Sequence, residues 1–421
     1  MAWVALFFYR YFVYNGEMSY YLWNPGRRMI AVETPDEYQR WSKEPGFVVP
    51  TPDEIQKHVR AQEDKWNELR RQGQELTSPS VYLATVSQGG KDGYAIASEK
   101  MIRELRNLDV NIKLHNDRQK VGILFHNPYS ILRMENQFRI LFTMFESTKL
   151  PPDWRDYLEA ADLILVPSKW CQQIFKDYGF DARVIPLGFD PTIYSYIDRP
   201  IPRDENKDFV FVHYNAFNLR KGFMELWEAF NRTFRKDEPV KLLLKTTLKQ
   251  IPLPITPSQY PNVIIEQGPF EDWEMAKLLG RSHCFVYPGR GEGFGLTPLE
   301  AMATGCPAIL PNATGMTEYF NSEYMYEVKV KEWVPATYKR YKDVDVGKMA
   351  LSDVEDLGRQ MRWVYEHQEE AKEKGRRAAE YVKQWTWSAT ARMLKEVIDQ
   401  YQEMPTENRP IRNILTLEEV R

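Results

Sequence analysis

The chain has 421 residues, which exceeds the size at which a single hydrophobic core stops growing, so two main domains are expected. Lysine and arginine (56 together) nearly balance aspartate and glutamate (59 together), and the formal net charge is −3. This balance gives no general reason to expect a nucleic acid or an anionic membrane as a partner. The cysteines are Cys171, Cys284 and Cys306, far apart and without a Cys-x-x-Cys pair. They disfavour a disulfide framework and a structural zinc site, and they favour a reducing compartment such as the cytoplasm.

Residues 1–78 are predicted to be an extension that is partly helical. Residues 2–14 are apolar, but an arginine interrupts them and they are too short to span a bilayer. We interpret this segment as a packed strand, or as a stretch upstream of a translation start at Met18, rather than as a membrane anchor. No stable membrane insertion is therefore expected. The tetrapeptide Thr-Pro-Asp-Glu occurs at 34–37 and 51–54. It has the pattern of a capping box, which predicts that two helices begin there.

Short apolar runs that alternate with helical stretches begin at residue 81. The first series is VYLATVS, VNIKLH, VGILFH, FRILFTMF, DLILVP and ARVIPLGF, and the second is FVFVHYN, VKLLLKTT, NVIIEQG, HCFVYPG and PAILPN. Continuous apolar strands separated by helices are typical of parallel sheets that are buried on both faces. We therefore predict an α/β fold with two doubly wound sheets, a linker at 190–208 and terminal helices within 378–403.

Ligands of open parallel sheets bind beyond the carboxyl ends of the strands, so the loops at those ends are the first candidates for a site. The chain contains neither a Walker sequence nor G-x-G-x-x-G. The loop 87–95 contains Gly90 and lies between a predicted strand and a predicted helix. Its amides could approach a phosphate or a sugar, although a plain tight turn would need the same glycines.

Arg220 and Lys221 follow the first strand of the second series, just before a predicted helix. Two adjacent cations beside helix amides suit a diphosphate, because they can stabilise negative charge as it develops on a leaving group. A solvated basic pair is the alternative. The position of the pair at the carboxyl end of a strand favours a binding role.

Two glutamates, Glu292 and Glu300, lie in the stretch GRGEGFGLTPLEAMATGCPAI at 289–309. Glu292 is in a glycine-rich loop, where the backbone bends sharply or a ligand approaches closely. A carboxylate there can accept hydrogen bonds from two hydroxyls of one sugar. Glu300 has two interpretations: it closes a capping box with Thr297, or it binds a second diol such as a ribose.

The spacing Glu292-x7-Glu300 resembles the signature of retaining nucleotide-sugar glycosyltransferases of the family 4 type, also called glycosyl transferases group 1. Other segments agree with this resemblance, which covers about residues 80–403: NLRKG, FRILFTMFESTKLPPDW, DLILVPSKWCQQIFKDYGFDARVIPLGFDP and QWTWSATARMLKEVIDQY. The resemblance implies a GT-B fold, which consists of two facing Rossmann-like domains with a central cleft. The implied domains are 79–195 on the acceptor side and 205–385 on the donor side, with the helix 386–403 crossing back to the first.

The resemblance also implies roles for individual residues. Glu292, Arg220 and Lys221 are the expected catalytic residues: the carboxylate would hold hydroxyls of the donor sugar, and the cations would neutralise the leaving diphosphate. Glu300 would hold the ribose. The remaining expected donor contacts are Gly293, Phe294, Gly295, Leu296, Thr297, Gly90, Asn215 and Gly268.

Two positions depart from the family pattern. An arginine that is common near the start of the basic loop is Asn215 here. The histidine that usually follows a strand of the first domain is absent, because Phe145 and Glu146 stand there. Either His126, from the preceding strand, or Glu146 is expected to take its place on the acceptor side.

Asp343 and Asp345 form an Asp-x-Asp sequence, which binds manganese in glycosyltransferases of the other fold. They lie in a charged insertion past the last predicted strand, where a surface loop is favoured over a metal site. The resemblance implies catalysis without a metal, and no cofactor is expected besides the nucleotide-diphosphate sugar, which is the donor substrate.

The sequence thus predicts a metal-independent, retaining glycosyltransferase that moves a sugar from a nucleotide-diphosphate sugar to a hydroxyl. Two alternatives remain: another reaction on the same fold, such as phosphorolysis or nucleotide-sugar epimerisation, or a non-catalytic nucleotide-sugar-binding module. The acceptor is open and could be a saccharide, a lipid, a protein or a nucleic acid.

Overall fold

The structure is a computed structural model that describes residues 11–14, 17–23, 29–32, 80–85, 93–114, 119–134, 136–202, 207–215, 218–246, 260–342 and 344–405. Residues 1–77 and 78–421 form separate compact units. In the first unit, three strands form an antiparallel sheet in the order β1–β2–β3, and they are Tyr11–Tyr14, Glu17–Trp23 and Met29–Val32. The helix starts expected at the two Thr-Pro-Asp-Glu sequences lie outside the described residues.

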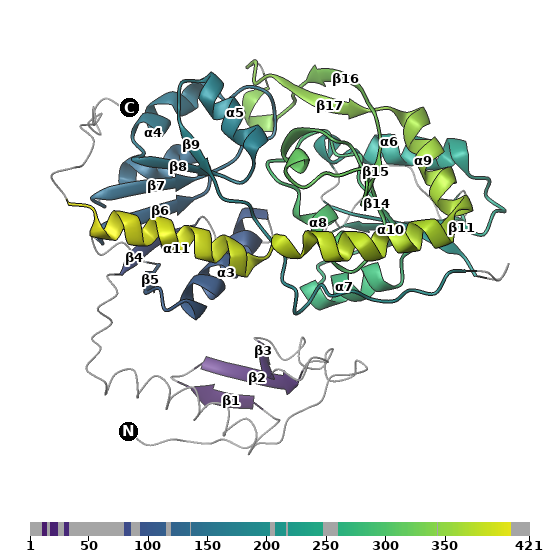
Figure 1. The fold of residues 1–421 in the computed structure, drawn as a ribbon, viewed down its shortest axis with the longest axis horizontal. Coiled ribbons are helices and arrows are strands. Elements are labelled where there is room, and N and C mark those ends of the chain that lie inside the picture. Colours follow the sequence, from purple (N-terminus) through teal and green to yellow (C-terminus); the bar gives the residue numbers. More distant parts are fainter. Residues whose placement is uncertain are drawn as a thin grey trace. The chain divides into compact units, whose positions relative to one another are not determined.

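The second unit contains two six-stranded parallel sheets (Figure 1). The first has the order β5–β4–β6–β7–β8–β9, and in chain order its strands are Val81–Ala84, Ile112–Lys113, Val121–Phe125, Phe138–Phe142, Leu163–Val166 and Ala182–Val184. The second has the order β12–β11–β10–β13–β14–β15, and in chain order its strands are Phe209–Tyr214, Val240–Thr246, Val263–Gln267, Cys284–Val286, Ala308–Leu310 and Tyr326–Glu327. The predicted α/β fold with two doubly wound sheets is confirmed.

Each sheet has one place where the direction of strand addition reverses. In the first sheet it lies between β4 and β6, and in the second it lies between β10 and β13. At such a point, the connections that follow the two neighbouring strands run to opposite faces of the sheet. A crevice therefore opens beyond the carboxyl ends of these strands. The loops after β10 and β13 carry Arg220, Lys221 and Glu292, so the topology of the second sheet brings these residues together.

Helices pack on the faces of both sheets (Figure 1). Those that the structure describes are α3 Gly93–Asn107, α4 Arg155–Glu159, α5 Lys169–Asp177, α6 Phe223–Thr233, α7 Asp272–Gly280, α8 Leu296–Ala303, α9 Val354–Glu366, α10 Gln368–Tyr381 and α11 Trp387–Glu403. Short 3-10 helices are η1 Pro128–Arg133, η2 Pro152–Trp154, η3 Leu219–Lys221, η4 Thr314–Glu318, η5 Lys339–Tyr341 and η6 Val382–Gln384. None of the described helices is both long enough and apolar enough to cross a membrane.

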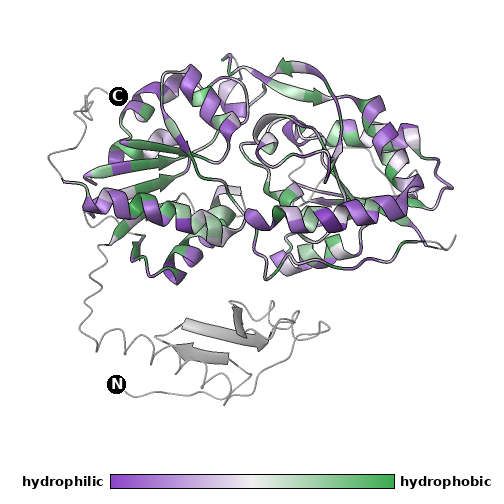
Figure 2. Cartoon of the chain, viewed as in Figure 1, coloured by the Kyte–Doolittle hydropathy of each residue, from purple (hydrophilic) through white to green (hydrophobic). Residues whose placement is uncertain are grey.

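The central strands are buried because helices cover them. All five residues of β6 are buried, and Figure 2 shows hydrophobic residues gathered on the strands of the first sheet. The last helix, α11, is amphipathic and lies against α3 and β6 of that sheet. The ring of Tyr401, near its end, meets the ring of Phe138 edge to face, with 5.3 Å between the centroids. The chain thus returns from the second sheet to the first.

A hairpin beyond the last predicted strand was missed. β16 (Val330–Pro335) pairs antiparallel with β17 (Lys348–Ser352), and only β17 lies in the stretch that was predicted to be a charged insertion. Residues 336–347, which we call the strap, connect the two strands. Tyr341 and Val346 of the strap are buried in the core of the first sheet, beside Trp154. The strap therefore joins the two sheets, while the side chain of Asp345, for which a surface loop was expected, is 70% exposed.

The linker 190–208 is anchored to the second sheet at Arg199, whose side chain is only 4% exposed. Its guanidinium Nη2 donates to the carbonyl oxygens of Leu279 and Thr304, at 3.3 and 3.1 Å. These carbonyls lie at the carboxyl-terminal ends of α7 and α8, where helix dipoles favour a cation and terminal carbonyls need donors. The linker is therefore structural where it meets these helices.

We predict that Arg199→Met lowers the free energy of unfolding by about 2–4 kcal/mol, because two buried carbonyls lose a charged donor and keep only the N–H groups of Ser282 and Ile197. Urea denaturation followed by circular dichroism measures this change. Arg281→Met is the matched control, because Arg281 is exposed and pairs with Glu266 at the surface. The control should cost less than about 1 kcal/mol. Equal stabilities of the two variants would contradict the anchoring role.

Candidate active site

The basic loop after β10 is held against the loop after β13 by a close backbone approach. Gly222 has a φ of 71°, and a Cβ atom there would lie 1.9 Å from the carbonyl oxygen of Pro288. Only glycine fits this position. The backbone N–H of Arg290 also donates to the carbonyl of Arg220, at 2.7 Å. Arg220 and Lys221 are thereby placed beside the loop that carries Glu292.

Glu292 is the centre of the site and is only 8% exposed. One of its oxygens, Oε1, accepts hydrogen bonds from the Lys221 ammonium at 2.5 Å, from Arg220 Nη1 at 3.3 Å and from the hydroxyl of Tyr287. Arg220 Nη1 also donates to the carbonyl of Gly291, at 2.7 Å. The structure thus brings the three expected catalytic residues into direct contact. Tyr287 was not expected, although its place at the end of β13 was a signal.

The charges of the cluster determine how its members titrate. Burial by itself would raise the pKa of Glu292, but Lys221 and Arg220 outweigh burial and hold this pKa below its ordinary value. Burial, together with the positive charge of Arg220, holds the pKa of Lys221 below its ordinary value, although Glu292 acts in the opposite direction. Burial by itself would lower the pKa of Arg220, but the negative charges of Glu146 and Glu292 outweigh burial and raise this pKa above its ordinary value. Glu292 is therefore ionised at neutral pH.

The backbone of Glu292 is held by the 3-10 helix η4, which was not predicted to be part of the site. The N–H of Glu292 donates to Oγ1 of Thr314 at 3.1 Å, and its carbonyl accepts from the N–H of Gly315 at 2.8 Å. A Cβ atom at Gly315 would lie 2.1 Å from the carbonyl of Gly293. The 3-10 helix η4 thus fixes the direction in which the Glu292 carboxylate points.

The glycines around Glu292 allow the first sheet to approach. A Cβ atom at Gly291 would lie 2.2 Å from the carbonyl of Glu146, and one at Gly293 would meet the side chain of Met144. Ser168 Oγ of the first sheet donates to the carbonyl of Gly293 at 2.8 Å. In the structure, the atoms that come closest to these two glycines therefore belong to the loop that follows β7 of the first sheet.

Helix α8 begins at Leu296, after Gly295 with a φ of 93°. Thr297 is consequently inside the helix and does not cap it, so the capping-box interpretation of Glu300 is wrong. Glu300 Oε2 instead accepts a hydrogen bond from the hydroxyl of Tyr214, at 2.6 Å. Asn215 Nδ2 donates to Thr297 Oγ1 at 3.0 Å. Glu300 thus lies beside the end of β10, next to the basic loop.

The surroundings of Glu300 disfavour its charged form. Burial, with a further contribution from the negative charge of Asp272, raises the pKa of Glu300 to about 8. Lys100 of the first sheet pairs with Asp272 and partly offsets this effect. In the absence of a ligand, Glu300 is therefore mostly protonated at neutral pH, in contrast to Glu292.

The remaining predicted donor residues have different positions. Phe294 is buried, with its ring against Tyr319 at 5.4 Å between centroids, so only its backbone is available to a ligand. Gly268 follows β12 with a φ of 101°, and its carbonyl accepts from the ammonium of Lys245. Lys245 is buried at the end of β11 and was missed, because its run reads as an ordinary apolar strand. Gly90 lies outside the described residues.

The two candidates for the acceptor side differ in their contacts. Glu146 Oε1 lies 3.4 Å from Arg220 Nη2, and Glu146 Oε2 accepts from the hydroxyl of Tyr338 on the strap at 3.1 Å. The ring of His126 packs against Tyr94 instead, with 4.9 Å between the centroids. The structure therefore places Glu146 in direct contact with the predicted catalytic residues.

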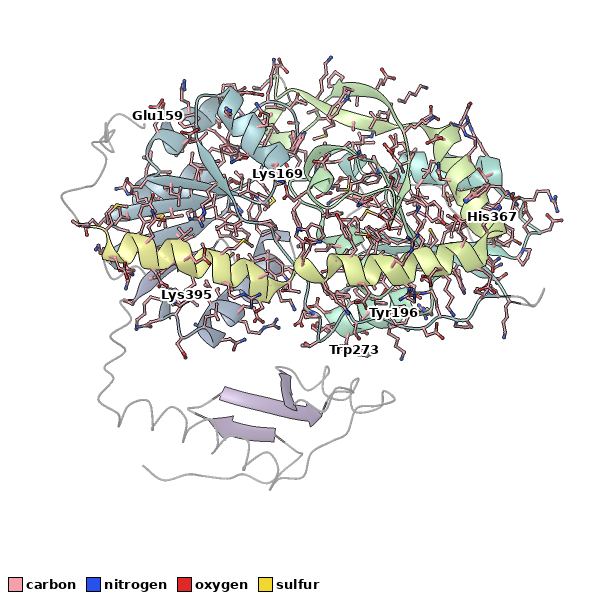
Figure 3. All side chains as sticks on the ribbon, viewed as in Figure 1. Glu159, Lys169, Tyr196, Trp273, His367 and Lys395 are labelled. Atoms are coloured by element: carbon pink, nitrogen blue, oxygen red, sulfur yellow. The ribbon has the colours of Figure 1, made fainter. Side chains whose placement is uncertain are left out.

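Further contacts join the two sheets beside the site. The backbone N–H of Lys169, which Figure 3 labels at the start of α5, donates to Glu318 Oε2 at 2.8 Å. Asp345 of the strap pairs with Lys149 at 2.5 Å, and Asp343 lies outside the described residues. Among the residues that the structure describes, no three His, Cys, Asp or Glu side chains gather as metal ligands would.

The arrangement combines a fixed carboxylate, two cations and two helix starts at the carboxyl end of a parallel sheet. The N-cap residues of α6 and α8 are Gly222 and Gly295, which have no side chain to cap these helices. Cations and helix amides bind anions such as phosphates, and an ionised carboxylate accepts hydrogen bonds from hydroxyls. The site can therefore hold a molecule with both phosphates and a polyol.

Comparison with known proteins agrees with this chemistry. Residues 258–394 match the family described as “Family 4 Glycosyltransferase in conflict systems”. Human alpha-1,3/1,6-mannosyltransferase ALG2 is 24% identical over 234 residues, which are 49% of this chain and 55% of ALG2. The chain spans 55 to 62% of the length of the first curated relatives that it matches.

Two solved structures share the fold at low identity. Sucrose-phosphate synthase from Thermosynechococcus elongatus aligns with a TM-score of 0.58 and 13% identity, over 76% of this chain and 98% of that one. Anabaena Alr3699/HepE in complex with UDP-glucose aligns with a TM-score of 0.55 and 12% identity, over 76% of this chain and all of that one. The chain therefore has the GT-B fold, and its residues 258–394 are similar to family 4 glycosyltransferases.

Proposed function

We propose that the protein transfers a sugar from a nucleoside-diphosphate sugar to an acceptor hydroxyl, with retention of configuration and without a metal ion. One observation carries this proposal: the ionised, buried Glu292 is held by Lys221 and Arg220 at the point where the strand order reverses. HepE, which shares the fold, has a structure in complex with UDP-glucose, and this supports a nucleotide sugar as the donor. The free, buried cysteines support a reducing location, and we propose the cytoplasm.

The cations and helix starts would bind the donor's diphosphate. Arg220 presents a planar fork of N–H groups that matches phosphate oxygens, and Lys221 adds a compact charge beside it. The first amides of α6 and α8 add the positive ends of two helix dipoles. These groups would stabilise the charge that develops on the diphosphate as it leaves, which is the task that a metal ion performs in other enzymes.

The two glutamates would grip opposite ends of the donor. Glu292 would accept hydrogen bonds from hydroxyls of the transferred sugar, and Glu300 would accept them from the ribose. In the reaction, the bond between the anomeric carbon and the diphosphate breaks with its electron pair on the phosphate oxygen. The acceptor oxygen bonds to the same face of that carbon, and its proton passes to the departing phosphate.

We expect the purified protein to release a nucleoside diphosphate slowly from one member of a panel of nucleotide sugars without any acceptor. The release should continue in EDTA, because protein cations and amides replace a metal ion. Chromatography of the nucleotide products measures both results. Binding without any release would favour a non-catalytic module, and loss in EDTA that manganese restores would contradict metal independence.

We expect Glu292→Gln to lower kcat by about a hundredfold or more, the scale for the loss of one oriented electrostatic contact in the transition state. The affinity for the bare nucleoside diphosphate should not fall, because this ligand has no sugar for Glu292 to hold. Steady-state kinetics and calorimetry on the same variant test the two parts. Normal turnover, or weaker diphosphate binding, would show that Glu292 has another role.

We expect binding of the nucleoside diphosphate to release a proton from Glu300 at neutral pH. Its pKa is about 8 without a ligand, and hydroxyls that donate to the carboxylate favour the ionised form. Affinity should therefore rise as the pH increases toward about 8 and level off above it. Calorimetry in two buffers of different ionisation enthalpy measures the released proton.

Glu300→Gln is the control for this prediction, because glutamine can accept the hydrogen bond from Tyr214 but does not titrate. Binding of the nucleoside diphosphate to this variant should release fewer protons, and the binding free energy should be weaker by about 1.5–3 kcal/mol. The melting temperature of the variant should change little. The same proton release from both proteins would rule out Glu300 as its source. A large loss of stability in the variant would indicate a structural role.

A further inference from the structure

Arg220 is shared between carboxylates that come from the two sheets. Its Nη1 lies 3.3 Å from Oε1 of Glu292, after β13 of the second sheet. Its Nη2 lies 3.4 Å from Oε1 of Glu146, after β7 of the first sheet. The guanidinium thus bridges the sheets, and two nitrogens that could bind a phosphate already face a carboxylate.

The cationic charge of the cluster is balanced internally. Arg220 and Lys221 carry two positive charges, and Glu146 and Glu292 carry two negative charges when ionised. The contacts of Lys221 with Glu292 and of Arg220 with both carboxylates use much of the attraction that the cations could offer. A diphosphate that enters the site must therefore compete with a carboxylate for Arg220.

The two carboxylates are held with different strength. Glu292 is buried, receives additional hydrogen bonds from Lys221 and Tyr287, and has a backbone fixed by η4. The side chain of Glu146 is 22% exposed, and besides Arg220 it contacts the hydroxyl of Tyr338, which donates to it at 3.1 Å. Glu146 is thus the carboxylate that can leave Arg220 at the lower cost, by rotating its side chain.

Building on the proposed function, we propose that Glu146 is a displaceable stand-in for the diphosphate of the donor. In the empty site it neutralises Arg220 across the two sheets. The diphosphate takes its place on Arg220, and the released carboxylate then accepts a hydrogen bond from a polar group of the acceptor other than the reacting hydroxyl, whose proton passes to the departing phosphate. Glu146 is on this view a positioning residue that makes the acceptor bind after the donor.

The test compares Glu146→Gln with the native protein, with inorganic pyrophosphate as the probe in metal-free buffer. Glutamine keeps the size of the side chain and can accept from Tyr338, but it does not carry the competing charge. We expect pyrophosphate to bind the variant about tenfold more tightly, as measured by calorimetry. Glu318→Gln is the matched control, because Glu318 also joins the sheets but contacts Lys169 rather than Arg220.

Unchanged or weaker pyrophosphate binding in Glu146→Gln would overturn the proposal. An equal gain in pyrophosphate affinity in Glu318→Gln would also overturn it, as would the absence of pyrophosphate binding to all three proteins. If Glu146→Gln does not fold, Tyr338→Phe replaces it, because loss of the Tyr338 hydroxyl frees Glu146 and pyrophosphate affinity should then change. Unchanged affinity in that variant would also overturn the proposal.

Turnover separates this proposal from the proposed function. With an active nucleotide sugar, Glu146→Gln should show a lower donor KM together with a lower kcat, because the donor gains Arg220 and the acceptor loses a partner. A lower kcat at unchanged donor KM would overturn the displacement. If the native protein consumes no nucleotide sugar but Glu146→Gln still binds pyrophosphate more tightly, sugar transfer fails and the competition at Arg220 stands.

Discussion

A buried carboxylate stays ionised only when cations reach it, and at Glu292 this requirement shapes the whole site. Lys221 and Arg220 meet its Oε1 from a loop 71 residues earlier in the chain. Without them, burial would raise the pKa of Glu292 and favour the neutral acid. The same contacts keep both cations beside the start of α6, where we propose that the diphosphate binds. The ionised state of Glu292 and the proposed binding of a diphosphate thus involve the same two cations.

Backbone geometry makes these pairs possible. The reversal of strand order between β10 and β13 places two loops at one edge of the second sheet, and Gly222 lets them touch. Gly291 and Gly293 then allow the first sheet to approach so closely that Glu146 reaches Arg220. A side chain at any of these glycines would collide with backbone or side-chain atoms, so the distances in the cluster depend on them.

The two sheets are joined on several sides of the site. The strap inserts Tyr341 and Val346 into the core of the first sheet, and α11 packs on that sheet after the chain has left the second. Arg199 fixes the linker to the ends of α7 and α8. Because Glu146 belongs to one sheet and Glu292 to the other, the contact that both make with Arg220 depends on how these connections hold the sheets.

The sequence by itself determined the two parallel sheets, since continuous apolar runs between helices allow few other folds. It also located Glu292, Glu300, Arg220 and Lys221, because strands of such sheets end at the binding edge. Tertiary structure decided the rest: that Glu300 accepts from Tyr214 and does not cap α8, that the strap is partly buried, and that Glu146 rather than His126 meets Arg220. These outcomes depend on residues 70 to 200 positions apart, and no local pattern of polarity or spacing records such distances.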